Sequence, residues 1–162
     1  MATSILEQIS ENIKTVVASA EAANRLGVST HFTAVRPNRK QFAAAAWDDM
    51  TVLISRADAE KQPSDYGTIE WKQYFTLEAI VIDSDAATDS IDTRLNEVEA
   101  NIVKKLLEDT GRGTGTDGRS LAINTRHETS VPYIDEQSAM SEILIRIMVQ
   151  YRTKDNDPYT RM

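Results

Sequence analysis

The sequence predicts an α+β fold, in which a mainly antiparallel β-sheet is covered on one face by two amphipathic helices. Two long segments, Thr68–Asp83 and Ser141–Thr153, alternate apolar and polar residues as strands do. Two other segments repeat apolar residues at helical spacing, one at the N-terminus and one in the middle. The expected element order is α-β-β-β-α-β-β-β. The 162 residues are expected to form a single domain, 1–162.

The first helix is predicted by a capping box, because Ser4 precedes Glu7 by three residues. Its apolar stripe consists of Leu6, Ile9, Ile13, Val16, Val17 and Ala20. Gly27 is expected to close this segment. A short strand is predicted at Thr30–Val35, stopped by Pro37.

The region between the first strand and the long strand is less regular. Gln41–Asp49 is compatible with an extended arm or a single helical turn. Met50–Arg56 is predicted as a strand, with Val52 and Ile54 on one face. Ala57–Tyr66 is polar and contains a proline, so it is predicted as a loop or hairpin connection.

The second helix is expected to begin after Asp89 or Ser90 and to end near Thr110. Its apolar positions are Ile91, Leu95, Val98, Ile102 and Leu106, with Leu107 as a further candidate. A mobile glycine-rich loop at about 111–119 follows. Two short strands, Leu121–Thr125 and Ser130–Ile134, are then predicted before the long strand and the C-terminal tail at 154–162.

The two long strands carry more apolar surface than one core requires. One face of the last strand holds Ile143, Ile145, Ile147, Val149 and Tyr151. The opposite face still contains Leu144 and Met148, and the other long strand adds Ile80 and Ile82 there. A sheet with two partly apolar faces needs a second cover, such as a neighbouring subunit. This surplus indicates assembly.

Composition excludes several classes of function. A net charge of −7 argues against a dedicated nucleic-acid binder, because such proteins neutralise phosphates with Lys and Arg. The absence of cysteine excludes disulfides, thiolate nucleophiles and cysteine-based zinc sites. No apolar run reaches the length of a membrane span, and the N-terminus lacks the features of a signal peptide. The protein is expected to act without export.

Two motifs that suggest chemistry have ordinary explanations. Gly113–Gly118 matches G-x-G-x-x-G, but it follows a helix and precedes a strand, the reverse of a dinucleotide site. The aspartates Asp83, Asp85, Asp89 and Asp92 lack the order of a calcium loop and suit a helix N-terminus instead. We therefore predict no metal, no cofactor and no catalytic residues.

Other polar residues are candidates for contacts. His31 and His127 are the only histidines, and a surface or interface role is favoured over that of a catalytic base. Arg36, Arg39 and Lys40 form a basic turn, which is either solvated or in contact with an acidic neighbour. Tyr159 lies in a tail that either docks on another chain or frays.

Most of the chain resembles the tail terminator (tail completion, minor tail) proteins of long-tailed bacteriophages. The resemblance lies in the helix SILEQISENIKTVV, the strand GTIEWKQYFTLEAIVID, the helix IDTRLNEVEANIVKKLLED and the final VQYRTKDNDPYT. It implies a structural virion protein at the head–tail junction (neck). Such proteins form a homohexameric ring that caps the tail tube, ends its polymerisation and joins it to the head connector.

The resemblance also implies partners, namely other copies of the chain, the tail tube protein and the head–tail connector or stopper. DNA would pass through an acidic lumen without specific binding, and no membrane is involved. The candidate interface residues are Arg36, Arg39, Lys40, Arg112, Arg119, Leu144, Met148, Arg152 and Tyr159. The alternatives are another neck component, such as a head-closure or tube-like protein, a small binding domain or enzyme, and a dimeric cellular adaptor.

Overall fold

A computed structural model describes residues 3–22, 30–37, 47–64, 67–82, 90–115, 118–134, 139–155 and 157–160. Its main sheet has five strands in the order β3-β4-β5-β7-β6. Their bounds are β3 Thr33–Val35, β4 Thr51–Ser64, β5 Thr68–Ile82, β6 Asn124–Ile134 and β7 Met140–Lys154. Only β3 and β4 are parallel neighbours. A small antiparallel pair, β1 (Glu21–Ala22) and β2 (Thr30–His31), lies beside it.

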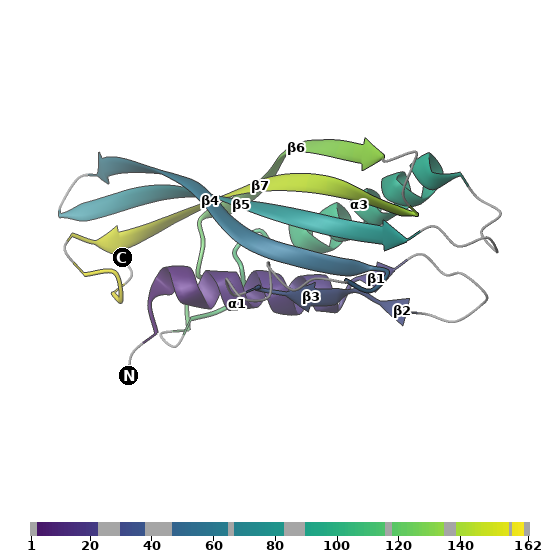
Figure 1. Cartoon of the computed structure of the whole chain (residues 1–162). Helices are drawn as coiled ribbons and strands as arrows, with labels where there is room; N and C mark the ends of the chain where they lie inside the picture. Colours follow the sequence, from purple (N-terminus) through teal and green to yellow (C-terminus); the bar gives the residue numbers. More distant parts are fainter. Residues whose placement is uncertain are drawn as a thin grey trace.

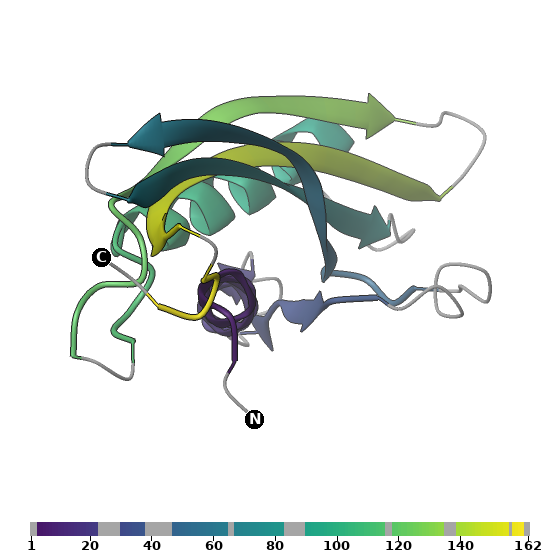
Figure 2. The ribbon, with the colours of Figure 1, turned by 90° about the vertical axis from the view of Figure 1, so that its left-hand side faces the viewer.

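Two helices, α1 (Ile5–Ala18) and α3 (Ile91–Leu107), lie on the same side of the main sheet (Figures 1 and 2). The predicted α+β architecture is therefore confirmed. The cap of α1 is the predicted Ser4, whose Oγ accepts from the Glu7 amide at 3.2 Å. Of the two caps considered for α3, Asp89 and Ser90, the cap is Ser90, whose Oγ accepts from the Thr93 amide at 3.3 Å. Neither of these helices is long and apolar enough to cross a membrane.

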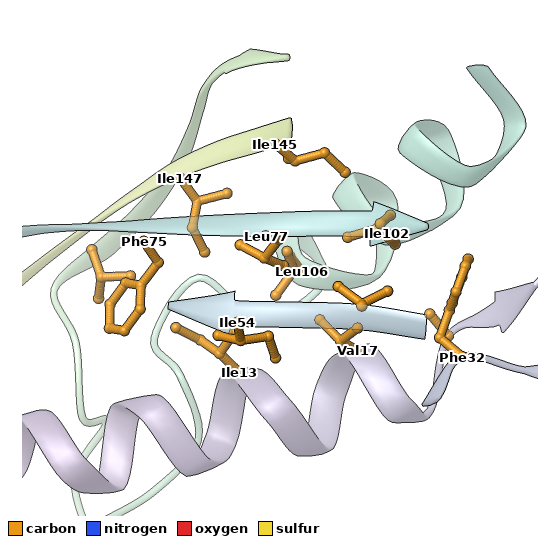
Figure 3. Close-up of a cluster of buried hydrophobic side chains, with 14 of the residues drawn as sticks. Ile13, Val17, Phe32, Ile54, Phe75, Leu77, Ile102, Leu106, Ile145 and Ile147 are labelled. Atoms are coloured by element: carbon orange, nitrogen blue, oxygen red, sulfur yellow. The ribbon is translucent and has the colours of Figure 1, made fainter. Parts of the chain in front are cut away.

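The core lies between the helices and the facing side of the sheet (Figure 3). The predicted helical stripes supply Ile9, Ile13, Val17, Leu95, Val98, Ile102 and Leu106, all almost completely buried. The sheet supplies Phe75, Leu77, Ile145 and Ile147 among others. Burying each such side chain contributes about 1.5–3 kcal/mol, so this layer dominates stability.

The β4–β5 hairpin is longer than the sequence predicts. Ala57–Tyr66 is not a loop through most of its length, because β4 continues to Ser64 and pairs with β5 throughout. A bulge between Arg56 and Ala59 absorbs the irregularity, and the Gln73 side chain donates to the carbonyls of Ala57 and Asp58, both at 3.0 Å. The hairpin reaches past the N-terminal end of α1 (Figure 1).

A second correction concerns β6. The two short strands predicted at Leu121–Thr125 and Ser130–Ile134 are one strand, Asn124–Ile134, paired with β7 along its length. A bulge between His127 and Thr129 interrupts the alternation, which made the sequence look like two segments.

A network of side chains fixes the end of β5. The Arg94 guanidinium, 1% exposed, donates to the Ile82 carbonyl at 2.8 Å and lies 3.5 Å from an Asp49 carboxylate oxygen. The other Asp49 oxygen accepts from the Ile82 amide at 2.7 Å. These contacts tie the end of β5 to the start of α3 and to the turn before β4. The aspartates at 83, 85 and 89 lie outside the described residues, as does Gly27.

The glycine-rich segment is hydrogen-bonded where the structure describes it. The Asp109 carboxylate accepts from the amides of Gly111 and Gly113 at 3.0 and 2.6 Å. The Leu121 amide donates to the Gly113 carbonyl at 3.0 Å. α3 ends at Leu107, three residues before the predicted Thr110, and the Arg112 guanidinium then donates to the carbonyls of Leu106 and Asp109.

Candidate interaction surfaces

The face of the sheet that points away from the helices carries two rows of residues near the ends of β5 and β6. Pairing places Leu53, Glu78, Leu144 and Val131 side by side across β4, β5, β7 and β6. The next row contains Thr51, Ile80, Glu142 and Tyr133. Residues paired across neighbouring strands point to the same face. Both rows therefore lie on one face of the sheet, on which Thr51, Leu53 and Ile80 are almost completely buried.

The part of this surface on β6 and β7 is apolar and open to solvent. Val131 is 52% exposed, Tyr133 64% and Met140 43%, and Leu144 is half-buried beside them. We refer to Val131, Tyr133, Met140 and Leu144, with Glu78 and Glu142, as the acidic-apolar patch. Large exposed apolar side chains that gather on one face often indicate an interaction site.

Two carboxyl groups lie in the middle of this patch. Burial, a hydrogen bond with Glu142 and the charge of Glu142 together raise the pKa of Glu78 to about 7. Arg146 is a diagonal neighbour of Glu78 by register, but its guanidinium turns away. It pairs with Asp58 at 3.3 Å and lies 4.5 Å from the centre of the Tyr74 ring. Within the described ranges, no cationic side chain pairs with Glu78 or Glu142.

The opposite half of the same face has a different charge arrangement. Glu70 pairs with Arg152 at 2.9 Å, and Glu60 pairs with Lys72 at 3.8 Å. The hydrogen bond from Arg152 lowers the pKa of Glu70 below its usual value. Carboxylates in that half, including Asp58, thus have cationic partners within the chain. Glu78, in contrast, has the carboxyl group of Glu142 as its hydrogen-bond partner.

The predicted interface residues of the sheet are divided by the structure. Leu144 is half-buried and belongs to the acidic-apolar patch. Met148 is only 6% exposed, so it is already covered within one chain. Arg152 is exposed but paired with Glu70. Sequence alternation placed all three on the outer face correctly, but it does not indicate which of them the chain itself covers.

The remaining candidates differ in their exposure. Arg112 is completely buried, so the expected exposure that made it a contact candidate is wrong, and burial lowers its pKa. Arg119 is exposed, and Tyr159 is 54% exposed. Arg39 and Lys40 lie outside the described residues. The C-terminal turn folds back onto α1, where the Ile5 amide donates to the Pro158 carbonyl at 3.2 Å.

Arg36 borders an open depression of about 580 Å³ between α1, the end of β3 and β4. Its guanidinium donates to the carboxylates of Glu7, at 2.7 Å, and Glu11. The hydrogen bond from Arg36 lowers the pKa of Glu7. The depression also contacts Lys14 and Arg56. Since Glu7 and Glu11 of the same chain neutralise the charge of Arg36, these ion pairs join the end of β3 to α1.

The histidines lie in different sheets, His31 on β2 and His127 on β6. His127 Nε2 is 2.8 Å from Ser130 Oγ and 3.8 Å from a Glu99 carboxylate oxygen. A hydrolytic triad requires the acid and the nucleophile on opposite ring nitrogens. Here both groups approach the same nitrogen, so these three residues do not form such a relay. Within the described ranges, no three acidic or histidine side chains are grouped to hold a metal ion.

Neither Glu78 nor Glu142 stands out in the sequence, because only strand register brings residues 64 positions apart onto one face. Their positions on alternating strands are visible in the sequence, but their proximity is not. Models of known protein families and curated protein sequences yield no match to this chain. Function is therefore inferred from the surfaces of the molecule itself.

Proposed function

We propose that this chain is a structural protein that assembles with copies of itself into a ring. In a long-tailed bacteriophage the ring would act as a tail terminator at the head–tail junction. It would cap the tail tube, end its polymerisation and contact the head connector. The proposal combines the resemblance in sequence with the distribution of apolar surface over the fold.

The single observation that carries the assembly role is the acidic-apolar patch. The two helices already close one face of the sheet, yet Val131, Tyr133 and Met140 remain open to solvent on the other. A monomer would gain solubility from polar residues there. Covering these side chains with another subunit removes apolar area from water, which favours association.

Charge supports the DNA-passage part of the proposal. With a net charge of −7, a ring of six copies would carry strong negative charge, and passing DNA would not adhere to a lumen lined with it. The proposed partners are the tail tube protein at one end of the ring and the connector at the other. Binding to either is a property of the assembled ring in this proposal.

The first experiment measures mass in solution by analytical ultracentrifugation over a range of concentrations. A ring of six 18.1 kDa chains has a mass of about 109 kDa. The variant Tyr133→Ser is expected to reduce assembly, because it removes an exposed aromatic side chain from the acidic-apolar patch. Tyr159→Ser changes a similarly exposed tyrosine elsewhere. Loss of assembly with Tyr159→Ser alone would place the contact at the C-terminal turn and contradict the patch.

The second experiment tests the tail role. Tail tubes from a phage lacking its terminator are incubated with the purified protein and examined by electron microscopy. Tubes of uniform length with a ring at one end are the expected result. A protein that binds the connector but not the tube would be a head-closure component. A stable monomer that binds neither would refute the proposal.

A further inference from the structure

Apart from Ile134 at the end of β6, the large exposed apolar side chains on the main body of the described chain occur at two separate places. One is the acidic-apolar patch. The other contains Leu107, 40% exposed at the end of α3, and Ile123, 48% exposed just before β6. These two segments adjoin, because the Ala122 amide donates to the Gly111 carbonyl at 2.7 Å. We refer to Leu107, Ile123 and Lys104 as the helix-end patch.

The charge of the helix-end patch is opposite to that of the acidic-apolar patch. Lys104 is exposed and lies three residues before Leu107, which places the two on neighbouring positions of the helix surface. Of the acids nearby, two are already engaged, and a third, Glu21, lines the same shallow depression as Lys104. Glu108 pairs with Lys105 at 2.7 Å, and the Asp109 carboxylate binds the backbone of the following loop. Lys104 makes no ion pair within the described residues.

The two patches are too far apart to meet within one molecule. The helix-end patch adjoins the start of β6, and the acidic-apolar patch lies at the end of the same strand, where β5 finishes and β7 begins (Figure 1). Ten residue steps along a strand span about 33 Å. A contact between the patches therefore requires two copies of the chain.

We propose that the acidic-apolar patch of one copy docks on the helix-end patch of a second copy, with Lys104 placed against Glu78 and Glu142. Each copy carries both surfaces, so neither needs a different protein. Apolar side chains meet apolar side chains, and the cation meets the two carboxyls that lack one. With a net charge of −7 on every copy, such local complementarity offsets general repulsion.

This contact joins two different surfaces, so it is head-to-tail. Head-to-tail contacts generate a closed ring when the rotation between copies closes, and a filament when it does not. The inference rests on the proposed assembly of copies and specifies its interface. It does not depend on the tail role, because a ring or filament joined in this way need not bind a tail tube.

The contact predicts a pH dependence of assembly. A lysine beside the carboxyls favours their ionised form, so docking releases a proton from the pair when Glu78 is protonated. Association should therefore strengthen as pH rises through about 7, the pKa of Glu78 in the free chain. On the same face, Arg146 is held by Asp58, and Leu53 and Thr76 have no ionisable side chain. Glu78 is thus the group whose ionisation is coupled to docking.

Charge reversal tests the proposal directly. Self-association of the full chain is measured by sedimentation velocity for Glu142→Lys, for Lys104→Glu and for the double variant. Each single reversal is expected to weaken association about tenfold or more. The double variant restores opposite charges across the interface and should return association to within about threefold of the original. Asp155→Lys, an exposed acid near the C-terminus, is the control for the change in net charge.

Three results would overturn the inference. The first is that the single reversals leave association unchanged, the second that the double variant associates no better than either single one, and the third that Asp155→Lys weakens association equally. Circular dichroism and thermal unfolding confirm that each variant folds. Lys104→Glu lies on an exposed helix face, so it provides the test even if Glu142→Lys is unstable. If the reversals act as expected but the protein fails to cap tail tubes, the interface stands and the tail role fails.

Discussion

Replacing Glu78 by glutamine should stabilise the isolated chain at alkaline pH. The Glu78 carboxyl is half-buried beside Glu142, with Leu53 and Leu144 on either side in its row. Glutamine keeps the shape and the ability to hydrogen-bond, but it carries no charge. The variant therefore removes the cost of ionising Glu78 in this place while leaving the packing unchanged.

The size of the effect follows from the pKa. The pKa rises from 4.5 to about 7, which corresponds to about 3 kcal/mol at about 1.4 kcal/mol for each pKa unit. Because the carboxyl is only half-buried, water screens much of this cost. We expect about 1–2 kcal/mol, or about 2–8 °C in Tm.

The sign depends on pH. A raised pKa means that the folded chain binds the Glu78 proton more tightly than the unfolded chain does. The unfolding free energy of the original protein should therefore fall between about pH 4.5 and pH 7 and then level off, as far as Glu78 contributes. The glutamine variant lacks this fall. It should be equally stable near pH 4 and more stable at pH 8.

The assay is urea unfolding at pH 4, 6 and 8, at concentrations where both proteins are monomeric. Glu70→Gln is the matched control, because Arg152 lowers the pKa of Glu70. The stabilisation from Glu70 is present above about pH 4.5 and is lost as pH falls through its lowered pKa, so its variant should be less stable at pH 8. A Glu78→Gln variant that gains nothing at pH 8, or gains equally at pH 4, would refute the assignment.

Three further substitutions test the interior and the glycine-rich segment. Gly113→Ala should cost more stability than Gly118→Ala. The two glycines have similar φ angles, +75° and +77°, so the backbone strain is similar, but only at Gly113 would the added Cβ lie 2.8 Å from the Asn12 side chain. Thermal unfolding should show a loss of about 2 kcal/mol against about 1 kcal/mol; equal losses would contradict the contact with Asn12. Arg94→Ala should cost about 2–4 kcal/mol, since it leaves the Ile82 carbonyl without its donor and opens a cavity. A loss below about 0.5 kcal/mol in urea unfolding would show that this network does not hold the end of β5.

Local patterns determined much of the fold. The start of α1 followed from Ser4, and the start of α3 followed to within one residue from the choice between Asp89 and Ser90, because a capping side chain acts within three residues. The helical stripes and the long strands followed from periodicity, which reflects a single buried side. The strand predicted at Thr30–Val35 is wrong as one element, because it is divided between β2 and β3 of different sheets. Two further errors lie where periodicity is interrupted. Bulges after Arg56 and His127 shifted the alternation, so strand was taken for loop in β4 and one strand for two in β6.

The sequence by itself therefore determined that this chain builds a sheet with helices on one face and apolar residues left over on the other. Only the tertiary structure decided which of those residues stay open. Met148 is covered within the chain, whereas Val131 and Tyr133 are exposed. The sheet register also brings Glu78 and Glu142 together in an apolar setting. The physical reason is that burial and charge pairing depend on neighbours across strands, which lie far apart along the chain.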